Sequence, residues 1–301
     1  MIYVLTGEND FALRRKLSEL LDVGAERYDG IELSFEQLAD ICAGSTLFSS
    51  KRQVVIDSLG DNKHLWSEAI PLLERAGEDT TLVLVEPKPD KRTKTFKWLQ
   101  KNAEIIDHKP WTERDSSKAA AWVQEQIKSR GIKVNPAEAQ FLVHWVGVNQ
   151  QDLHQAIEKL ELVGVADEKA IKSAVDPAME SNVFILLETA LKGDGAAIKQ
   201  QIDGLERSDD AYRVLGLLAS QIQQLVALVL GGKSSSLTAA DMGVSPFMMN
   251  RLTPYSRSMD RKVTLSILEW TAEADRLTKT VDNDPWMIVE KLLLKIVAVK
   301  Q

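Results

Sequence analysis

The chain has 301 residues, of which 44% are hydrophobic and 27% charged. This composition excludes a disordered chain, and the length predicts about two globular domains or three small ones. Its net charge of −7 excludes a surface that is basic throughout, but it does not exclude a local basic patch. A single cysteine excludes an internal disulfide framework, and the lack of a signal-peptide pattern or of ~18 consecutive apolar residues predicts a cytoplasmic protein with no membrane contact.

Short apolar runs alternate with helical patterns over the first hundred residues. The predicted strands are Met1–Thr6, Gln53–Asp57, Thr81–Glu86 and Ala103–Asp107. Leucines at helical spacing and other local signals predict helices at residues 13–21, 35–42, 65–76 and 93–102. A capping box at Ser34 and Gln37 opens the second of these helices. This alternation predicts an open, mostly parallel α/β sheet.

Beyond about Pro110 the strand pattern stops and helix signals follow one another. Asn135-Pro136, Asn149 and Asp284-Pro285 are typical helix starts. Residues 209–230 and 260–279 predict two long helices, and residues 231–236 (GGKSSS) predict an exposed turn. The expected fold class is therefore α/β plus all-α, with a small helical bundle followed by a larger one.

The first predicted strand leads into GENDFALR, where a phosphate-binding loop would lie. Ala12 and Leu13 replace the second glycine and the lysine of that motif, and Glu8 and Asp10 would repel a triphosphate. The strand that ends at Glu86 lacks the Asp–Glu pair that would hold magnesium, so Glu86 is expected to be a solvated carboxylate. The sequence thus disfavours nucleotide hydrolysis. An acidic nucleotide-processing enzyme that uses Glu8, Asp10 and Glu86 is kept as a distant alternative.

The histidines and the cysteine show no spacing that is typical of a metal site or of a nucleophile. His144 and His154 lie in neighbouring predicted helices without an HExxH pattern, and no histidine is near Cys42 in the sequence. We therefore predict no metal, no cofactor and no catalytic residue.

Residues 44–52 (GSTLFSSKR) place two bulky apolar side chains between a predicted helix and a predicted strand. Leu47 and Phe48 are adjacent, and neighbours on a helical turn point ~100° apart, which makes it hard to bury both. Either the pair packs into the core, or it inserts into a pocket of a partner and supplies most of the binding energy.

A basic run extends from Lys88 to Lys109 and has a local excess of four positive charges. It is either a solvated loop and helix face or a surface for phosphates or an acidic partner. Phe96 and Trp98 lie within it and fit the core side of the predicted helix at least as well as a stacking platform.

Several segments, in order, resemble the delta-subunit family of the bacterial DNA polymerase III clamp loader. They are Tyr3–Asn9 (YVLTGEN), Ser45–Val55 (STLFSSKRQVV), Lys88–Arg92 (KPDKR) and Asn149–Leu160 (NQQDLHQAIEKL). The likeness runs in order to about residue 180 and continues more loosely beyond it.

This resemblance implies three parts: a degenerate AAA+-like sheet domain at residues 1–112, a three-helix lid at 113–180 and a helical collar at 181–301. It implies a non-catalytic subunit of a DNA-directed DNA polymerase holoenzyme, cytoplasmic and associated with the nucleoid. Such a subunit binds the beta sliding clamp and opens it for loading onto primed DNA without hydrolysing ATP. The implied partners, which bind through the collar, are the gamma or tau motor subunits and delta prime.

By the same resemblance, Leu47 and Phe48, with Thr46, match the clamp-binding residues of the family. Gly44 stands where clamp-binding peptides commonly have glutamine. The candidate contacts with DNA or an acidic partner are Lys88, Lys91, Arg92 and Lys94. The alternative from another class is an α/β-helical adaptor unrelated to replication, in which Leu47 and Phe48 are core residues.

Overall fold

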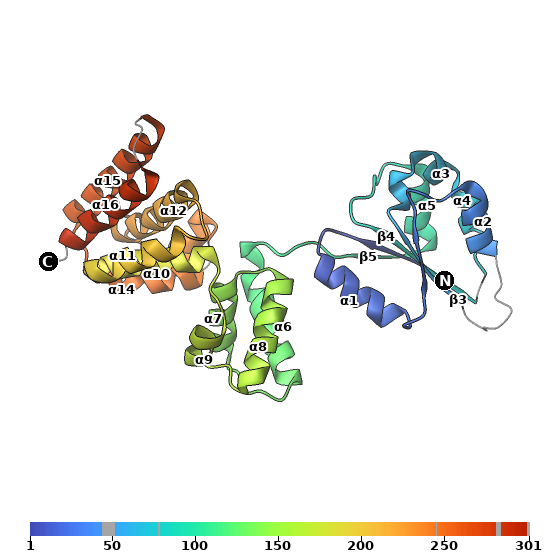
Figure 1. Cartoon of the computed structure of the whole chain (residues 1–301), viewed down its shortest axis with the longest axis horizontal. Coiled ribbons are helices and arrows are strands. Elements are labelled where there is room, and N and C mark those ends of the chain that lie inside the picture. Colours follow the sequence, from blue (N-terminus) through green and yellow to red (C-terminus); the bar gives the residue numbers. More distant parts are fainter. Residues whose placement is uncertain (44–51, 78, 245, 281–283, 300–301) are drawn as a thin grey trace. The chain divides into compact units, whose positions relative to one another are not determined.

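The buried apolar runs of the first third of the chain form one parallel sheet. The computed structural model describes residues 1–43, 52–77, 79–244, 246–280 and 284–299, and it divides into a sheet unit, Met1–Pro110, and a helical unit, Trp111–Gln301 (Figure 1). The strand order is β2-β3-β4-β1-β5, and every pairing is parallel. The strands are β1 (Ile2–Thr6), β2 (Glu26–Asp29), β3 (Arg52–Asp57), β4 (Thr80–Glu86) and β5 (Glu104–Asp107).

Helices cover both faces of the sheet, as its alternating side chains require. Val4 faces one cluster and its neighbour Leu5 faces the other. The first face packs against α2 (Phe35–Ala43), α3 (Lys63–Glu68), α4 (Ile70–Leu73) and α5 (Lys94–Asn102). The second face packs against α1 (Asp10–Leu20), which lies on the opposite side of the sheet in Figure 1.

Two elements of the sheet unit differ from the sequence prediction. Strand β2 was not predicted, and the single helix predicted at residues 65–76 is divided into α3 and α4. Pro71 lies in the first turn of α4, where its missing N–H costs nothing, and a new helix therefore starts there.

The helical unit begins with a cluster of four helices in its described residues, where three were predicted. They are α6 (Ser116–Ser129), α7 (Pro136–Val146), α8 (Gln150–Val163) and α9 (Glu168–Ala174). The predicted capping box of α7 is present, because Asn135 accepts from the amide of Glu138 and Glu138 accepts from the amide of Asn135. The additional helix α9 is short and begins at its own cap, Asp167.

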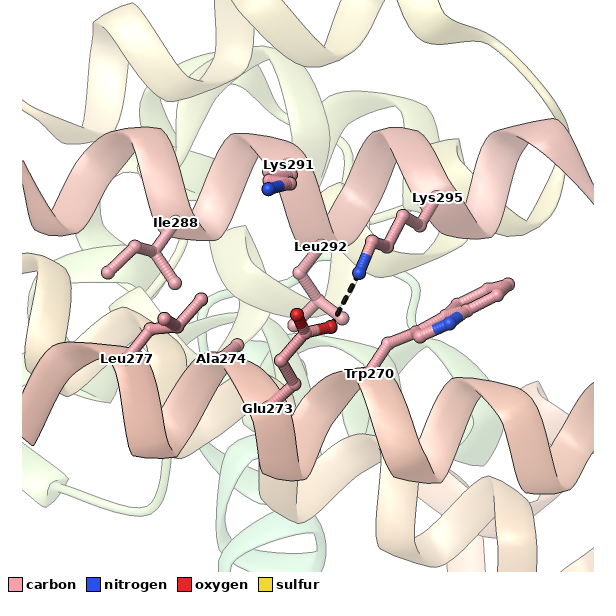
Figure 2. A pocket seen from close by; sticks show the side chains of 8 residues that line it. All are labelled: Trp270, Glu273, Ala274, Leu277, Ile288, Lys291, Leu292 and Lys295. Atoms are coloured by element: carbon pink, nitrogen blue, oxygen red, sulfur yellow. Dashed lines mark hydrogen bonds and ion pairs between the residues drawn. The ribbon is translucent and has the colours of Figure 1, made fainter. Parts of the chain in front are cut away.

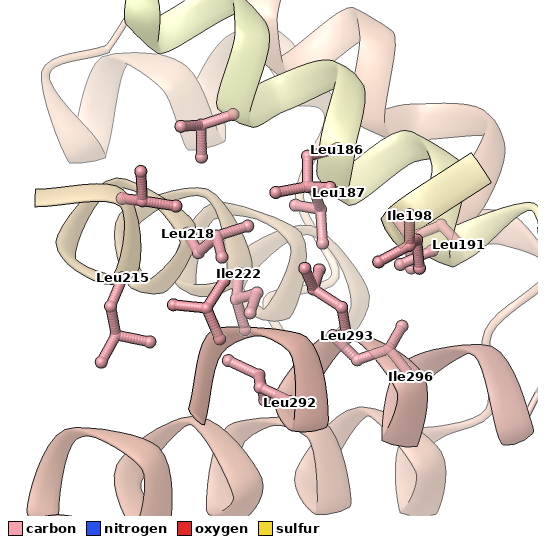
Figure 3. Close-up of a cluster of buried hydrophobic side chains, with 14 of the residues drawn as sticks. Leu186, Leu187, Leu191, Ile198, Leu215, Leu218, Ile222, Leu292, Leu293 and Ile296 are labelled. Atoms are coloured by element: carbon pink, nitrogen blue, oxygen red, sulfur yellow. The ribbon is translucent and has the colours of Figure 1, made fainter. Parts of the chain in front are cut away.

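A second cluster of helices completes the unit. It comprises α10 (Met179–Leu191), α11 (Gly195–Leu205), α12 (Ala211–Leu230), α13 (Ser235–Met242), α14 (Pro246–Arg257), α15 (Arg261–Thr280) and α16 (Pro285–Ala298). Leu187, Leu218 and Leu293 meet in its core from three different helices (Figure 3). Helix α12 is long and apolar enough to cross a membrane by length and composition, but its buried stripe packs against α10, α14 and α15.

The predicted turn at residues 231–236 is shorter than expected. Ser234 caps α13 by accepting from the amide of Leu237, so the last two serines belong to that helix. The two helical clusters have separate cores within one unit. The boundaries of the three-part division at residues 112 and 180 stay a prediction.

Candidate functional site

The segment that carries the predicted clamp-binding residues is bounded by two well-packed elements. Thr46, Leu47 and Phe48 lie outside the described residues. Before them, α2 ends at Ala43, and after them β3 begins at Arg52. What the structure describes of this site is therefore the two elements on either side of residues 44–51, namely α2 and β3, which we call the frame.

Helix α2 is fixed by its first turn and by its buried face. The hydroxyl of Ser34 accepts from the amide of Gln37 at 3.2 Å, and the Gln37 side chain accepts from the amide of Ser34 at 2.8 Å. This is the capping box that the sequence predicted. Leu38, Ile41 and Cys42 are buried in the core on the α2 side of the sheet. Burial also raises the pKa of the Cys42 thiol to about 11, which keeps it a neutral packing residue.

Arg52 joins three elements at the start of β3. Its guanidinium donates two hydrogen bonds to the Glu26 carboxylate of β2, at 2.8 and 2.7 Å. Its Nη1 donates to the carbonyls of Asp40 and Ile41 in α2, at 3.3 and 2.9 Å. The Tyr28 hydroxyl donates to the same carboxylate at 2.7 Å. We call this arrangement the Arg52 clasp.

No local pattern in the sequence predicts the Arg52 clasp. Arg52 lay within the segment that carries the resemblance but was not assigned a role, and Glu26 lay in the strand that was not predicted. The hydrogen bond from Arg52 lowers the pKa of Glu26 to about 2, so the ion pair stays charged at neutral pH. A cluster formed by residues 26 positions apart can be found only once the strands are paired.

At the edge of the sheet formed by the carboxyl ends of the strands, amide groups of the loop after β1 donate hydrogen bonds to acceptors within the chain. The amides of Gly7 and Asn9 donate to the carbonyls of Pro87 and His108, at 3.1 and 3.0 Å. The amide of Ala12 donates to the Asn9 side chain at 3.1 Å. In a phosphate-binding loop such amides would point at the ligand. Here they have acceptors already.

This edge of the sheet is also acidic. Four of the five strands that the structure describes end in a carboxylate, namely Asp29, Asp57, Glu86 and Asp107. Nearby, Glu8 pairs with Lys88 at 2.6 Å. Arg27 pairs with Asp57 at 2.6 Å and Lys109 pairs with Asp107 at 3.7 Å. These carboxylates therefore already engage nearby cations that a phosphate group would need.

Glu86 is not the solvated carboxylate that the sequence predicted. Its side chain is buried and accepts from the amide of Gly60 at 3.0 Å. A Cβ at Gly60 would lie 2.8 Å from Glu86 Oε2, so a larger residue there would force the Glu86 carboxyl to shift. Burial raises the pKa of Glu86 to about 7. A carboxyl that holds a backbone turn is poorly placed to hold magnesium or to activate water.

The basic candidates lie on the exposed side of α5 and of the loop before it. Lys88 pairs with Glu8, and Arg92 pairs with Asp90 at 3.0 Å. Lys91 and Lys94 are exposed. The aromatic residues of this run belong to the core side, because Phe96 is buried and Trp98 packs beside it. The run therefore presents cations to solvent, while Phe96 lies on the core side of α5.

No group of His, Cys, Asp or Glu side chains with the arrangement of a metal site occurs in the described part of the chain. His144 of α7 is half-buried and instead contacts α10 and α14. Its Nε2 lies 2.8 Å from Nη1 of Arg251, whose Nη2 donates to Glu188 at 2.8 Å. Arginine has no acceptor, so His144 Nε2 must accept and the ring is neutral. Burial, with the charge of Arg251, lowers the pKa of His144 to about 3.

A small pocket lies between α15 and α16 (Figure 2). Lys295 crosses it to pair with Glu273 at 2.6 Å, and its ammonium lies 5.8 Å from the ring centre of Trp270. The pocket encloses roughly 230 Å³ even with its open side included. Pockets for small-molecule ligands are typically ~300–1,000 Å³, so this one is best described as a gap between packed helices.

The comparisons with known proteins agree with the resemblance found in the sequence. The model of the family "DNA polymerase III, delta subunit" matches residues 3–109, and that of its C-terminal domain matches residues 180–296. A comparison with curated proteins finds no match. The chain is similar in structure to the Bacillus subtilis DNA clamp loader delta protein, with a TM-score of 0.53 and 18% identity over 99% of this chain and 95% of that one. The Thermotoga maritima RuvB Holliday junction branch migration motor aligns with a TM-score of 0.37 and 11% identity, over 84% of this chain and 78% of that one.

Proposed function

Because the chain belongs to the DNA polymerase III delta subunit family, we propose that it binds the beta sliding clamp and opens the ring for loading onto primed DNA. The feature that carries this proposal is the frame around residues 44–51, in which a capped, buried helix and a core strand hold both ends of a segment containing Leu47 and Phe48. A leucine and a phenylalanine presented together can supply most of the energy of a small interface.

In the proposed mechanism, the chain binds the clamp without a chemical step of its own. Leu47 and Phe48, with Thr46, insert into an apolar pocket of the clamp and favour the open form of one ring interface. Such a ligand shifts the closed and open populations only by its difference in affinity for the two forms. Energy for the loading cycle would come from the neighbouring motor subunits, which expose or cover the segment.

The proposed lack of ATP hydrolysis is supported by the edge of the sheet. The amides of Gly7 and Asn9 already have carbonyl acceptors, and Glu86 is buried against Gly60. Two measurements test this: equilibrium dialysis with labelled ATP for binding, and an ATPase assay for turnover. The isolated chain is expected to show neither binding at micromolar nucleotide nor turnover, whereas turnover by a highly purified sample would contradict the proposal.

The second helical cluster is proposed as the collar through which the gamma or tau subunits and delta prime are bound. Apolar side chains on α15 and α16 support this, because Leu265, Met287 and Leu294 are exposed on helices whose other face is core. Direct contact with DNA or with an acidic partner is proposed for Lys88, Lys91, Arg92 and Lys94, and would weaken with added salt. We place the complex in the cytoplasm, at the nucleoid.

Ring opening is tested with a clamp that carries a fluorescent pair across one subunit interface. Adding the chain without ATP is expected to increase the separation of the pair. It is also expected to speed release of the clamp from circular DNA. A chain that binds the clamp but leaves both signals unchanged would refute the opening role and keep only the binding role.

A further inference from the structure

The cation that stabilises the last carbonyls of α2 comes from another element, strand β3. The final four carbonyls of a helix lack partners within the helix, and a cation near them is stabilising. Helix α2 has no basic residue in its own last turn. The guanidinium of Arg52 takes this place, with Nη1 at 2.9 Å from the carbonyl of Ile41 and 3.3 Å from that of Asp40.

The guanidinium is itself held in one orientation. Both of its hydrogen bonds to Glu26 are short, and the hydroxyl of Tyr28 also donates to Glu26 Oε2, the oxygen that accepts from Arg52 Nη2. The Arg52 side chain is only 14% exposed. A planar fork with five donors can meet a carboxylate and two carbonyls at once, which a lysine ammonium cannot do with the same geometry.

We propose that Arg52 is a positioning residue for the clamp-binding segment, because its clasp fixes the end of α2 against the start of β3 and so sets the separation between the two ends of residues 44–51. This inference rests on the proposed function. A segment whose ends are already fixed has less conformational freedom to lose on binding, and this raises its affinity without any new contact.

The same two strands contain a matched control. Arg27 of β2 makes two hydrogen bonds to Asp57 of β3, at 2.6 and 2.9 Å, near the other end of the strands. Both pairs therefore join β2 to β3 through a bidentate arginine–carboxylate contact. Only the Arg52 pair extends to α2 among the hydrogen bonds of the described residues.

The test is a set of clamp titrations with the full chain, using the R52Q, R52K and R27Q variants. L47A/F48A and a synthetic peptide of residues 44–51 serve as references. R52Q is expected to bind the clamp about 5- to 20-fold more weakly than the wild type, towards the affinity of the free peptide. R27Q is expected to bind within twofold of the wild type. R52K keeps the positive charge but lacks the planar fork of donors. It is therefore expected to be more stable to urea than R52Q, but to bind the clamp no more tightly than R52Q.

Each result decides between the inference and the function on which it rests. If L47A/F48A loses binding while R52Q binds like the wild type, the positioning role is wrong and the clamp-binding role stands. If R27Q and R52Q weaken binding in proportion to their loss of stability, the clasp is merely structural. If a folded L47A/F48A variant binds normally, both proposals fail. Should R52Q not fold, R52K is subject to the same comparison.

Discussion

At the scale of single residues, the turn after β1 depends on a glycine that has no substitute. Gly7 has φ +100°, and a Cβ there would lie 2.1 Å from the carbonyl oxygen of His108. The obstacle is backbone, which cannot move aside as a flexible side chain can. This turn also places the amides of Gly7 and Asn9 on carbonyl acceptors. Gly7 thus holds the loop in a conformation that is poorly suited to binding phosphate. A phosphate-binding loop would also need a glycine at this position.

A Gly7→Ala variant is therefore expected to destabilise the sheet unit by about 2–4 kcal/mol, from the strained φ and the contact with His108. Gly24→Ala is the control, because its Cβ would meet nothing within 4 Å and its φ is not positive. This control is expected to change stability by less than about 0.5 kcal/mol. Urea unfolding of both variants measures the difference, and equal losses would contradict this account of the turn.

At the scale of elements, the contact of α7 with α10 and α14 depends on a half-buried charged group. Arg251 bridges His144 and Glu188, and its guanidinium lies 4.2 Å above the ring centre of Phe184. The side chains of Arg251 and Glu188 are 20% and 15% exposed. This group joins the two helical clusters, so its loss affects how they pack together.

Arg251→Met is expected to cost about 2–4 kcal/mol, because Glu188 would be left as an uncompensated charge in a largely buried place. The control is Lys279→Met, which removes an exposed pair with Asp275 on α15 and is expected to cost less than about 0.5 kcal/mol. Guanidinium chloride unfolding compares them. A double variant with Glu188→Gln should lose less than the sum of the single losses, and simple additivity would argue against the coupling.

Elements with strong local signals could be predicted from the sequence, and elements defined by distant partners could not. The cap Asn135 and the capping box of Ser34 and Gln37 are local, and α7 and α2 begin where they predict. Strand β2 reads ERYD, with half-buried residues alternating with exposed ones, and it has no apolar run to indicate it. The Arg52 clasp needs that strand to be in place. Leu47 and Phe48 stay a prediction from the sequence.

At the scale of the whole molecule, a buried glutamate and a half-buried histidine give the two units opposite responses to acid. The pKa of Glu86 in the sheet unit is raised to about 7 from an ordinary 4.5, so its contribution to stability is full below pH 4.5 and is lost as the pH rises to 7. The pKa of His144 in the helical unit is lowered to about 3 from 6.5. Its contribution is full above pH 6.5 and is lost as the pH falls.

Between pH 7 and pH 5 the sheet unit should gain about 2 kcal/mol from Glu86, and the helical unit should lose about 2 kcal/mol from His144. Hydrogen exchange under increasing denaturant measures each unit separately. The comparison is made with Glu86→Gln and His144→Gln, so that His108 and all other titrating groups cancel. If the wild type and Glu86→Gln had the same pH dependence in the sheet unit, Glu86 would not titrate as described.

The clamp-binding role is tested most directly by titrating the full chain against its beta sliding clamp beside the L47A/F48A variant, with urea unfolding of both proteins. Loss of a buried Leu–Phe anchor pair is expected to weaken binding at least about 100-fold, and the free energy of unfolding should stay within about 0.5 kcal/mol of the wild type. Unchanged binding by the folded variant would contradict the role. A large loss of stability instead would mean that Leu47 and Phe48 belong to the core.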